Sequence, residues 1–171
     1  MDTKSPHSIK DELVAFIPSL RAFAVSLSGN RSTADDLVQE TLVKAWSKLD
    51  SFRPGTNLRA WLFRILRNTY YSELRKRRTE VSHANGIPAE ELICKAGQPF
   101  HVELQEFSEA LNTLPPERRE ALVLVGAVGL SYNEAAEICG CEPGTVKSRV
   151  SRARAELAGI LHFGQKDEPA R

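Results

Sequence analysis

The chain has 171 residues, with 23 Lys and Arg residues against 22 Asp and Glu residues, so its formal net charge is only +1. The longest apolar stretch, residues 121–130, is half the length of about 20 residues that a membrane-spanning helix needs, so we expect no membrane segment. The N-terminus has no apolar signal core and the three cysteines are too few for a disulfide framework, so the sequence predicts a cytoplasmic protein.

The balanced net charge conceals three regions of alternating sign. Residues 1–80 carry 14 basic and nine acidic groups, residues 81–142 carry three and ten, and residues 143–171 carry six and three. Two basic segments on either side of an acidic one indicate two separate contacts with a polyanion, although solvated helix faces would give the same pattern.

Helical spacing dominates the first part of the chain. Apolar residues recur three or four apart over residues 13–27, which predicts an amphipathic helix over about 9–28 that ends at Gly29. A second helix is expected to start after Ser32 or Thr33. Its predicted buried stripe consists of Leu37, Val38, Thr41, Leu42, Ala45, Trp46 and Leu49.

A third helix is predicted over 57–78, after a break at Pro54-Gly55. Its inward residues are expected to be Leu58, Trp61, Leu62, Ile65, Leu66, Thr69 and Leu74. Residues 53–78 also hold eight basic groups and one acidic group with aromatics among them, a composition typical of a surface that holds single-stranded nucleic acid. Trp61 fits the core better than such a surface, whereas Phe52 fits either role.

The segment 79–101 shows no sustained periodicity and contains two glycines, two prolines and a single basic residue. We therefore interpret it as a flexible linker between two small helical domains, residues 9–78 and 102–161. A short helical turn near residues 89–94 is the alternative for part of it.

Helical spacing resumes after this linker. One helix is predicted over 102–114, where Pro115-Pro116 ends it, and another over about 119–128. The whole pattern predicts an all-α protein of two small helical domains, the second of which ends in the motif described next.

The chain after residue 130 has the layout of a helix-turn-helix. Ser131 and Glu134 form a capping-box pattern that opens a short helix, and Gly140 provides the turn. Pro143 then begins a second helix, which is expected to run to about Leu161.

The second helix of this motif has two different faces. Its predicted buried stripe consists of Val146, Val150, Ala153 and Leu157. The other face consists of Thr145, Lys147, Ser148, Arg149, Ser151, Arg152 and Arg154. Guanidinium, ammonium and hydroxyl donors of this kind bind guanine edges and phosphates, so the face predicts DNA reading, against the alternative of an ordinary basic helix in a bundle.

Catalytic and metal-binding patterns are absent from the sequence. The pair Cys139 and Cys141 has no second pair at zinc spacing, and there is no nucleophile motif or phosphate-binding glycine loop. We therefore expect no enzyme activity, no cofactor and no metal ion.

Several motifs together resemble a known family. Residues 35–41 (DDLVQET) and 44–46 (KAW) resemble region 2.2 of bacterial sigma factors, and residues 51–63 (SFRPGTNLRAWLF) resemble regions 2.3 and 2.4. Residues 114–120 (LPPERRE), 131–137 (SYNEAAE) and 144–150 (GTVKSRV) resemble region 4. The chain is thereby identified as a member of the extracytoplasmic-function (ECF) group of the sigma-70 family, whose two domains correspond to the two predicted here.

The resemblance implies three sets of site residues. The coiled coil of the polymerase β′ subunit would bind Asp36, Gln39, Glu40 and Val43. The −10 element would be recognised by Phe52, Thr56, Asn57, Leu58 and Asn68 around a flipped base, with Arg75, Lys76, Arg77 and Arg78 on the DNA backbone. The −35 element, which in this group resembles GGAAC, would be read by Thr145, Lys147, Ser148, Arg149, Ser151 and Arg152.

A finer resemblance concerns residues 16–23 (FIPSLRAF), 71–78 (YSELRKRR) and 137–141 (EICGC), which are similar to the EcfG-type general stress response sigma factors of alphaproteobacteria. It implies as partners the polymerase core, including its β flap, promoter DNA, an anti-sigma factor of the NepR type and, indirectly, a response regulator of the PhyR type.

Two other functions fit parts of the sequence. A sigma-like decoy would bind the anti-sigma factor without acting on promoters. Such decoys carry a receiver domain after the sigma-like part, which we do not expect here, and they need no basic face on the last helix. A helix-turn-helix regulator independent of polymerase would not need the motifs at 35–41 and 51–63.

Overall fold

The computed structural model describes residues 6–53, 55–83 and 102–163 of the chain. Throughout these ranges the regular structure is helical, which confirms the predicted all-α fold. The chain divides into two compact units, Met1–Ala96 and Gly97–Arg171, and each unit has buried apolar residues of its own.

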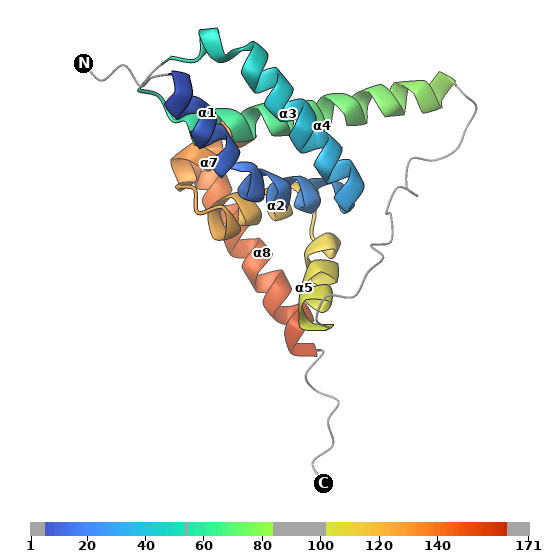
Figure 1. Ribbon diagram of the computed structural model, residues 1–171. Coiled ribbons are helices and arrows are strands. Elements are labelled where there is room, and N and C mark those ends of the chain that lie inside the picture. Colours follow the sequence, from blue (N-terminus) through green and yellow to red (C-terminus); the bar gives the residue numbers. More distant parts are fainter. Residues whose placement is uncertain (1–5, 54, 84–101, 164–171) are drawn as a thin grey trace. The chain divides into compact units, whose positions relative to one another are not determined.

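The described part of the first unit consists of α1 (Pro6–Ala15), α2 (Ile17–Ser28), α3 (Arg31–Ser47), the short 3-10 helix η1 (Leu49–Ser51) and α4 (Leu58–His83). Helix α3 packs against both α2 and α4 (Figure 1). Phe23 of α2 and Phe63 of α4 are fully buried, and their ring centroids lie 5.4 Å apart. This aromatic pair connects α2 directly to α4 in the core of the unit.

The structure divides the helix predicted over 9–28 at Phe16. The cause is Pro18, which has no N–H and whose ring would clash with the carbonyl one turn earlier if one helix continued. The Phe16 N–H bonds to both Glu12 O and Leu13 O at 3.2 Å, which closes α1. Helix α2 then begins with the proline in its first turn, where the missing N–H costs nothing.

Helix α3 begins at Arg31, earlier than the predicted start after Ser32 or Thr33. Asn30 is the N-cap, because its side chain accepts a 3.1 Å hydrogen bond from Thr33 N. Asparagine is among the best N-cap residues, since its side chain satisfies a backbone donor that the first helical turn leaves open.

The prediction that Trp46 is buried is wrong, because its side chain is 53% exposed. Leu37, Val38, Thr41 and Ala45 of the same stripe are buried, and Leu42 and Leu49 are half-buried. Each residue turns the helix by about 100°, so Trp46 lies one step beyond Ala45 and outside the contact with α2 and α4.

Helix α4 continues to His83, five residues beyond its predicted end at 78, so the first residues of the predicted linker are helical. The remainder of that linker, including the alternative turn near 89–94, lies outside the described residues. Of the predicted inward residues, Leu58, Leu62, Leu66 and Thr69 are buried, and Trp61, Ile65 and Leu74 are half-buried.

In the second unit α8 (Pro143–Phe163) is the central helix, because α5 (Val102–Thr113), α6 (Pro116–Leu122) and α7 (Tyr132–Cys139) each pack against it (Figure 1). The burial of Val146, Val150, Ala153 and Leu157 confirms the predicted stripe of this helix. An ion pair between Arg118 and Glu156 further links α6 to α8.

Helix α6 begins three residues before the predicted start at 119, because Pro116 occupies its first turn. It continues into a π-helical turn, η2 (Val123–Ala127), in which Val123 and Leu124 are buried. The predicted single helix is therefore an α-helix followed by a wider turn.

The helix-turn-helix forms as the sequence predicts. Ser131 Oγ accepts a 3.2 Å hydrogen bond from Glu134 N, and Ser131 N donates one of 2.7 Å to Glu134 Oε2, which completes the capping box. Gly140 ends α7 with φ +67°, a left-handed conformation that costs L residues about 1 kcal/mol and glycine almost nothing.

Across the described ranges, no helix combines the length and the apolar character that crossing a bilayer requires.

Candidate functional site

The outer face of α8 is the most regular candidate surface. Of the six residues predicted to read the −35 element, Lys147, Ser148, Ser151 and Arg152 are exposed, and Thr145 and Arg149 are half-buried. They lie opposite the buried stripe of the same helix, so the packing that holds α8 in the unit also orients this face outward. The arrangement can present two cationic side chains and two hydroxyls to a DNA groove.

Two of these side chains already have partners within the motif. The Arg149 Nη1 atom lies 3.8 Å from Cys141 Sγ in the turn before α8, and Ser148 Oγ donates a 2.9 Å hydrogen bond to Thr145 O. The first contact steadies the guanidinium at the start of the helix. The second leaves the Ser148 oxygen able to accept a hydrogen bond, because a hydroxyl oxygen has two lone pairs.

The loop predicted to meet the −10 element is held by its own polar residues. Thr56 Oγ1 donates a 2.7 Å hydrogen bond to Arg53 O, and Asn57 Oδ1 accepts one of 3.0 Å from Ala60 N. Asn57 thus caps α4, a structural role that sequence reasoning did not give it. Leu58 is buried, so its side chain supports the loop from the core side.

Phe52 and Trp61 form an aromatic contact that joins this loop to α4. Their ring centroids lie 5.1 Å apart and both side chains are half-buried. Asn68 is exposed seven residues after Trp61, which places the two on one face of α4, roughly 10 Å apart along the helix axis. The predicted base pocket therefore has an aromatic end and an amide end on the same helix face.

The basic end of α4 is open to solvent. Arg75, Lys76, Arg77 and Arg78, predicted to contact the DNA backbone, are all exposed. Arg75 lies seven residues after Asn68 and so continues the same face of the helix. The Arg67 guanidinium lies 4.8 Å from the centre of the Tyr71 ring, which adds a cation–π contact nearby.

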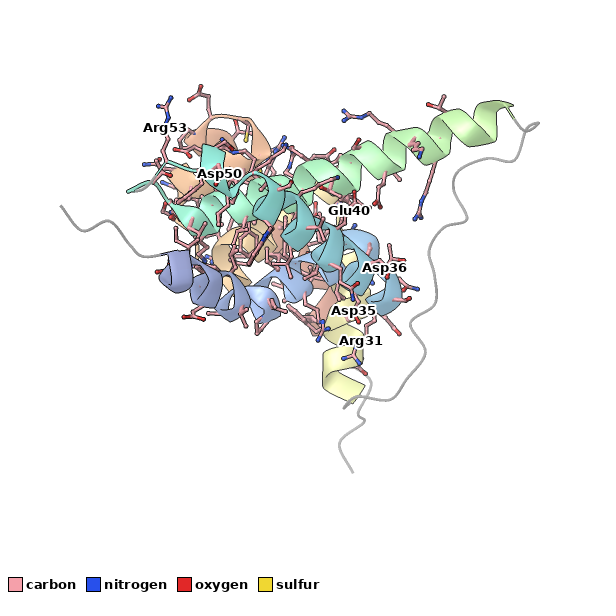
Figure 2. The ribbon with its side chains drawn as sticks, turned by 45° about the horizontal axis from the view of Figure 1, so that its top comes forward. Arg31, Asp35, Asp36, Glu40, Asp50 and Arg53 are labelled. Carbon is pink, nitrogen blue, oxygen red and sulfur yellow. The ribbon has the colours of Figure 1, made fainter. Side chains whose placement is uncertain are left out.

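The predicted polymerase-binding residues share the outer face of α3. Asp36, Gln39 and Val43 are exposed, with Val43 68% exposed, and Glu40 is half-buried. Figure 2 shows Asp35, Asp36 and Glu40 along this helix, with Arg31 at its beginning. Asp35 Oδ1 accepts a 2.6 Å hydrogen bond from Arg21 Nε, which ties it to α2.

Sequence reasoning missed that Trp46 belongs to this outer face. It lies three residues after Val43, close to one helical turn, and the two together add an exposed apolar area to an otherwise polar stripe. The helical angle between Trp46 and the centre of the buried stripe is the signal that could have placed it.

Sequence reasoning also missed a polar network between α3 and α4. Lys44 Nζ lies 2.6 Å from Glu40 Oε1 and 3.2 Å from Thr69 Oγ1. A hydrogen bond from the Glu73 carboxyl, together with that of Lys44, lowers the pKa of Glu40 below its ordinary value. The same bond to Glu40, with burial, raises the pKa of Glu73.

In the described ranges no three His, Cys, Asp or Glu side chains are grouped so that they could hold a metal ion. The described cysteines, Cys139 and Cys141, are not joined in a disulfide.

Comparison with known protein families assigns a match to each unit. The family described as Sigma-70 region 2 matches residues 14–80, and the family described as Sigma-70, region 4 matches residues 104–157. The first match contains α3, the 52–58 loop and most of α4, and the second contains the helix-turn-helix. All three candidate surfaces, on α3, on the loop with α4 and on α8, therefore lie within the matched residues.

The chain is also similar to individual proteins along most of its length. It is 57% identical to the ECF RNA polymerase sigma factor EcfG of Rhodopseudomonas palustris (strain TIE-1), over 91% of this chain and 86% of that protein. It is 51% identical to the sigma factor RpoE of Bartonella quintana, which was crystallised in complex with the anti-sigma factor NepR. That match has a TM-score of 0.79 and covers 94% of this chain and 98% of the other.

A second solved structure shares the fold alone. The PhyRSL protein of Sphingomonas sp. Fr1, solved by NMR in complex with NepR, is 20% identical to this chain with a TM-score of 0.66, and the match covers 96% of each.

Proposed function

Because the chain belongs to the ECF group of the sigma-70 family and is of the EcfG type, we propose that it directs core RNA polymerase to stress-response promoters by reading their −35 and −10 elements. As a sigma factor it is a specificity subunit of polymerase and not an enzyme. Its place of action is the cytoplasm, where bacterial polymerase and promoter DNA are found.

The outer face of α8 carries this proposal. Lys147 and Arg152 are exposed on the helix that a capped helix-turn-helix presents, and the buried side of the helix is fully occupied by the core. Arginine and lysine bind guanine O6 and N7 in the major groove, and hydroxyls bind either bases or phosphates. A −35 element rich in guanine at its start suits this set of donors.

Two surfaces of the first unit complete the function. The acidic outer face of α3, with Asp36, Gln39, Glu40 and Val43, would bind the β′ coiled coil. The loop from Phe52 to Leu58, with Asn68, would hold a flipped −10 base, while the basic residues 75–78 would hold the DNA backbone. An unstacked base needs an aromatic or apolar wall and an amide for its edge, and the Phe52–Trp61 contact and Asn68 offer both on one helix face.

The proposed partners follow from the same similarity. An anti-sigma factor of the NepR type would sequester the protein, as supported by the 51% identity to a sigma factor solved in complex with NepR. A response regulator of the PhyR type would then release it indirectly. The β flap of polymerase would contact the second unit.

Run-off transcription tests the proposal against its alternatives. Purified chain added to core polymerase should give a transcript from a promoter with a GGAAC-like −35 element and a matching −10 element, and a NepR-type protein should abolish it. Binding of the anti-sigma factor without any promoter-dependent transcript would indicate a decoy. Promoter binding without core polymerase association would indicate an independent helix-turn-helix regulator.

A further inference from the structure

A polar bridge connects α3, the helix proposed to bind polymerase, with α4, the helix proposed to bind −10 DNA. The Lys44 ammonium lies 2.6 Å from Glu40 Oε1 on its own helix and donates a 3.2 Å hydrogen bond to Thr69 Oγ1 on α4. Thr69 is 3% exposed, whereas the Lys44 and Glu40 side chains are 40% and 41% exposed. One amine therefore ties a hydroxyl inside the helix contact to a carboxylate at its edge.

A second carboxyl group makes this edge electrostatically unfavourable. Glu73 of α4 is a neighbour of Glu40 that lowers the pKa of Glu40 while its own pKa is raised, and two neighbouring carboxylates repel each other when both are ionised. Lys44 acts on both groups, while Lys76 and Arg77 each act on one of them from farther along α4. Across the α2 side, Arg21 is engaged with Asp35, more than one helical turn before Glu40. Lys44 thus places a cation between the two helices at this point.

An ordinary exposed ion pair four residues apart on a helix has little effect, because both side chains remain free to move. Lys44 differs in that the buried Thr69 hydroxyl fixes the position of its amine. A fixed cation next to Glu40 keeps that carboxylate charged and limits its rotamers. A charged Glu40 carboxylate with few available rotamers loses less conformational freedom when it binds a partner, which favours binding.

Resting on the proposed role of Glu40 in binding the β′ subunit, we propose that Lys44 is a positioning residue for the polymerase-binding face of α3. It holds the Glu40 carboxylate at the edge of the α3–α4 contact by offsetting the repulsion from Glu73, and Thr69 anchors its amine. Lys44 thereby affects polymerase binding through Glu40 and makes no contact of its own with polymerase.

The affinity of the full-length chain for core polymerase, measured by fluorescence anisotropy, tests this role. Lys44→Met, which keeps the length of the side chain and removes its charge, should weaken binding about 3- to 5-fold. Lys44→Arg should retain the affinity of the unmodified chain to within about twofold, because the cation remains. The matched control is Lys48→Met, which removes an exposed lysine at the end of the same helix and should leave the affinity unchanged.

A rescue variant separates the bridge from a direct contact. Adding Glu73→Gln to Lys44→Met should restore most of the lost affinity, because it removes the repulsion that Lys44 offsets. Failure of this rescue would show that Lys44 itself touches polymerase and would overturn the proposal, as would full affinity in Lys44→Met. Melting temperatures identify a merely structural effect: a Lys44→Met chain that melts lower yet binds polymerase normally would also overturn it.

Glu40→Gln distinguishes this proposal from the function on which it rests. Normal polymerase binding by Glu40→Gln would show that Glu40 does not contact polymerase. It would therefore refute both the assignment of Glu40 to the polymerase-binding face of α3 and the role of Lys44. Weak binding by Glu40→Gln together with normal binding by Lys44→Met would contradict the bridge alone.

Discussion

Helix α8 carries its buried stripe and its basic face on one continuous helix, whereas the surfaces proposed for the first unit draw on α3, the 52–58 loop and α4. In α8 the residues that pack and the residues proposed to bind DNA are separated by the helical repeat alone. In the first unit several proposed site residues also hold the structure: Asn57 caps α4, Phe52 contacts Trp61, and Glu40 is bridged to α4 through Lys44. A groove-reading helix can be formed locally, but a surface for a protein partner and an unstacked base requires several elements in register.

This difference predicts that damage to the core of one unit stays within that unit. Phe63→Ala removes a fully buried ring that contacts Phe23 and should destabilise the first unit by about 3–5 kcal/mol. Hydrogen-exchange mass spectrometry should show faster exchange over residues 13–79 and little change over 106–161. Val150→Ala is the reciprocal variant, since Val150 is buried in the second unit, and equal acceleration of exchange in both units by either variant would disprove their independence.

Removal of one cation from α8 should affect promoter choice and leave polymerase binding alone. Arg149→Ala should cost about 1–3 kcal/mol of discrimination at one −35 position, the usual value of a bidentate arginine–guanine contact. Transcription from promoters with single −35 substitutions, compared with core polymerase affinity, measures both.

The control for this prediction is Arg154→Ala, which removes an exposed arginine from the flank of the same helix. It should weaken transcription from all the promoters by a similar factor. An Arg149→Ala chain that lost core binding and kept its −35 preference would count against the assignment of α8.

Substitutions in the 52–58 loop and α4 should change promoter preference less than those in α8. They should act at the −10 element and not at the −35 element. Asn68→Ala should relax the preference at one −10 position by about 1 kcal/mol, the net value of a single hydrogen bond, because the aromatic wall remains. Replacing Arg75 to Arg78 by neutral residues should instead weaken all sequences alike, since phosphate contacts carry no sequence information. Permanganate footprinting of the open complex, beside transcription from −10 point variants, distinguishes the two. An unchanged order of preference with normal melting would refute the pocket.

The smallest expected effect concerns the carboxyl pair on the first unit. Because the folded protein raises the pKa of Glu73, the associated stabilisation is present below its ordinary value and is lost as the pH rises through the raised value. Glu40 has a lowered pKa, so its contribution is present above the ordinary value and is lost as the pH falls. The pair should therefore be most favourable near the ordinary glutamate pKa.

The variant Glu73→Gln has an amide in place of the Glu73 carboxyl group, so it has no carboxyl proton to lose as the pH rises. Its melting temperature relative to that of the unmodified chain should rise between about pH 4.5 and about pH 7.5, with a change in stability below about 0.5 kcal/mol. Asp50→Asn, which changes an exposed carboxylate of the same unit, provides the control. A relative stability of Glu73→Gln that falls over this range would contradict the carboxyl pair.

The sequence was sufficient for the second unit's motif because its signals are local. The capping box at Ser131 and Glu134, the left-handed Gly140 and the buried stripe of α8 all depend on residues within one or two turns of each other. The first unit was predicted less well. Pro18 divides the single helix that the apolar periodicity predicted into α1 and α2. The exposure of Trp46 depends on how α2 and α4 cover α3.

The bridge between Lys44 and Thr69 joins residues 25 positions apart in the sequence, and no sequence pattern predicts it. The roles assigned to the individual site residues stay predictions, because exposure and placement are compatible with them and do not test them. A cross-comparison of promoter positions supplies that test.

One experiment can test whether each unit recognises one promoter element, the second unit the −35 element and the first unit the −10 element. A library of promoters that varies every −35 and −10 position is transcribed by core polymerase with the unmodified chain, with Arg149→Ala and with Asn68→Ala. We predict that Arg149→Ala changes the preference only at −35 positions and that Asn68→Ala changes it only at −10 positions. A variant that altered the preference at the other element, or that lowered transcription without changing any preference, would contradict the assignment of one promoter element to each unit.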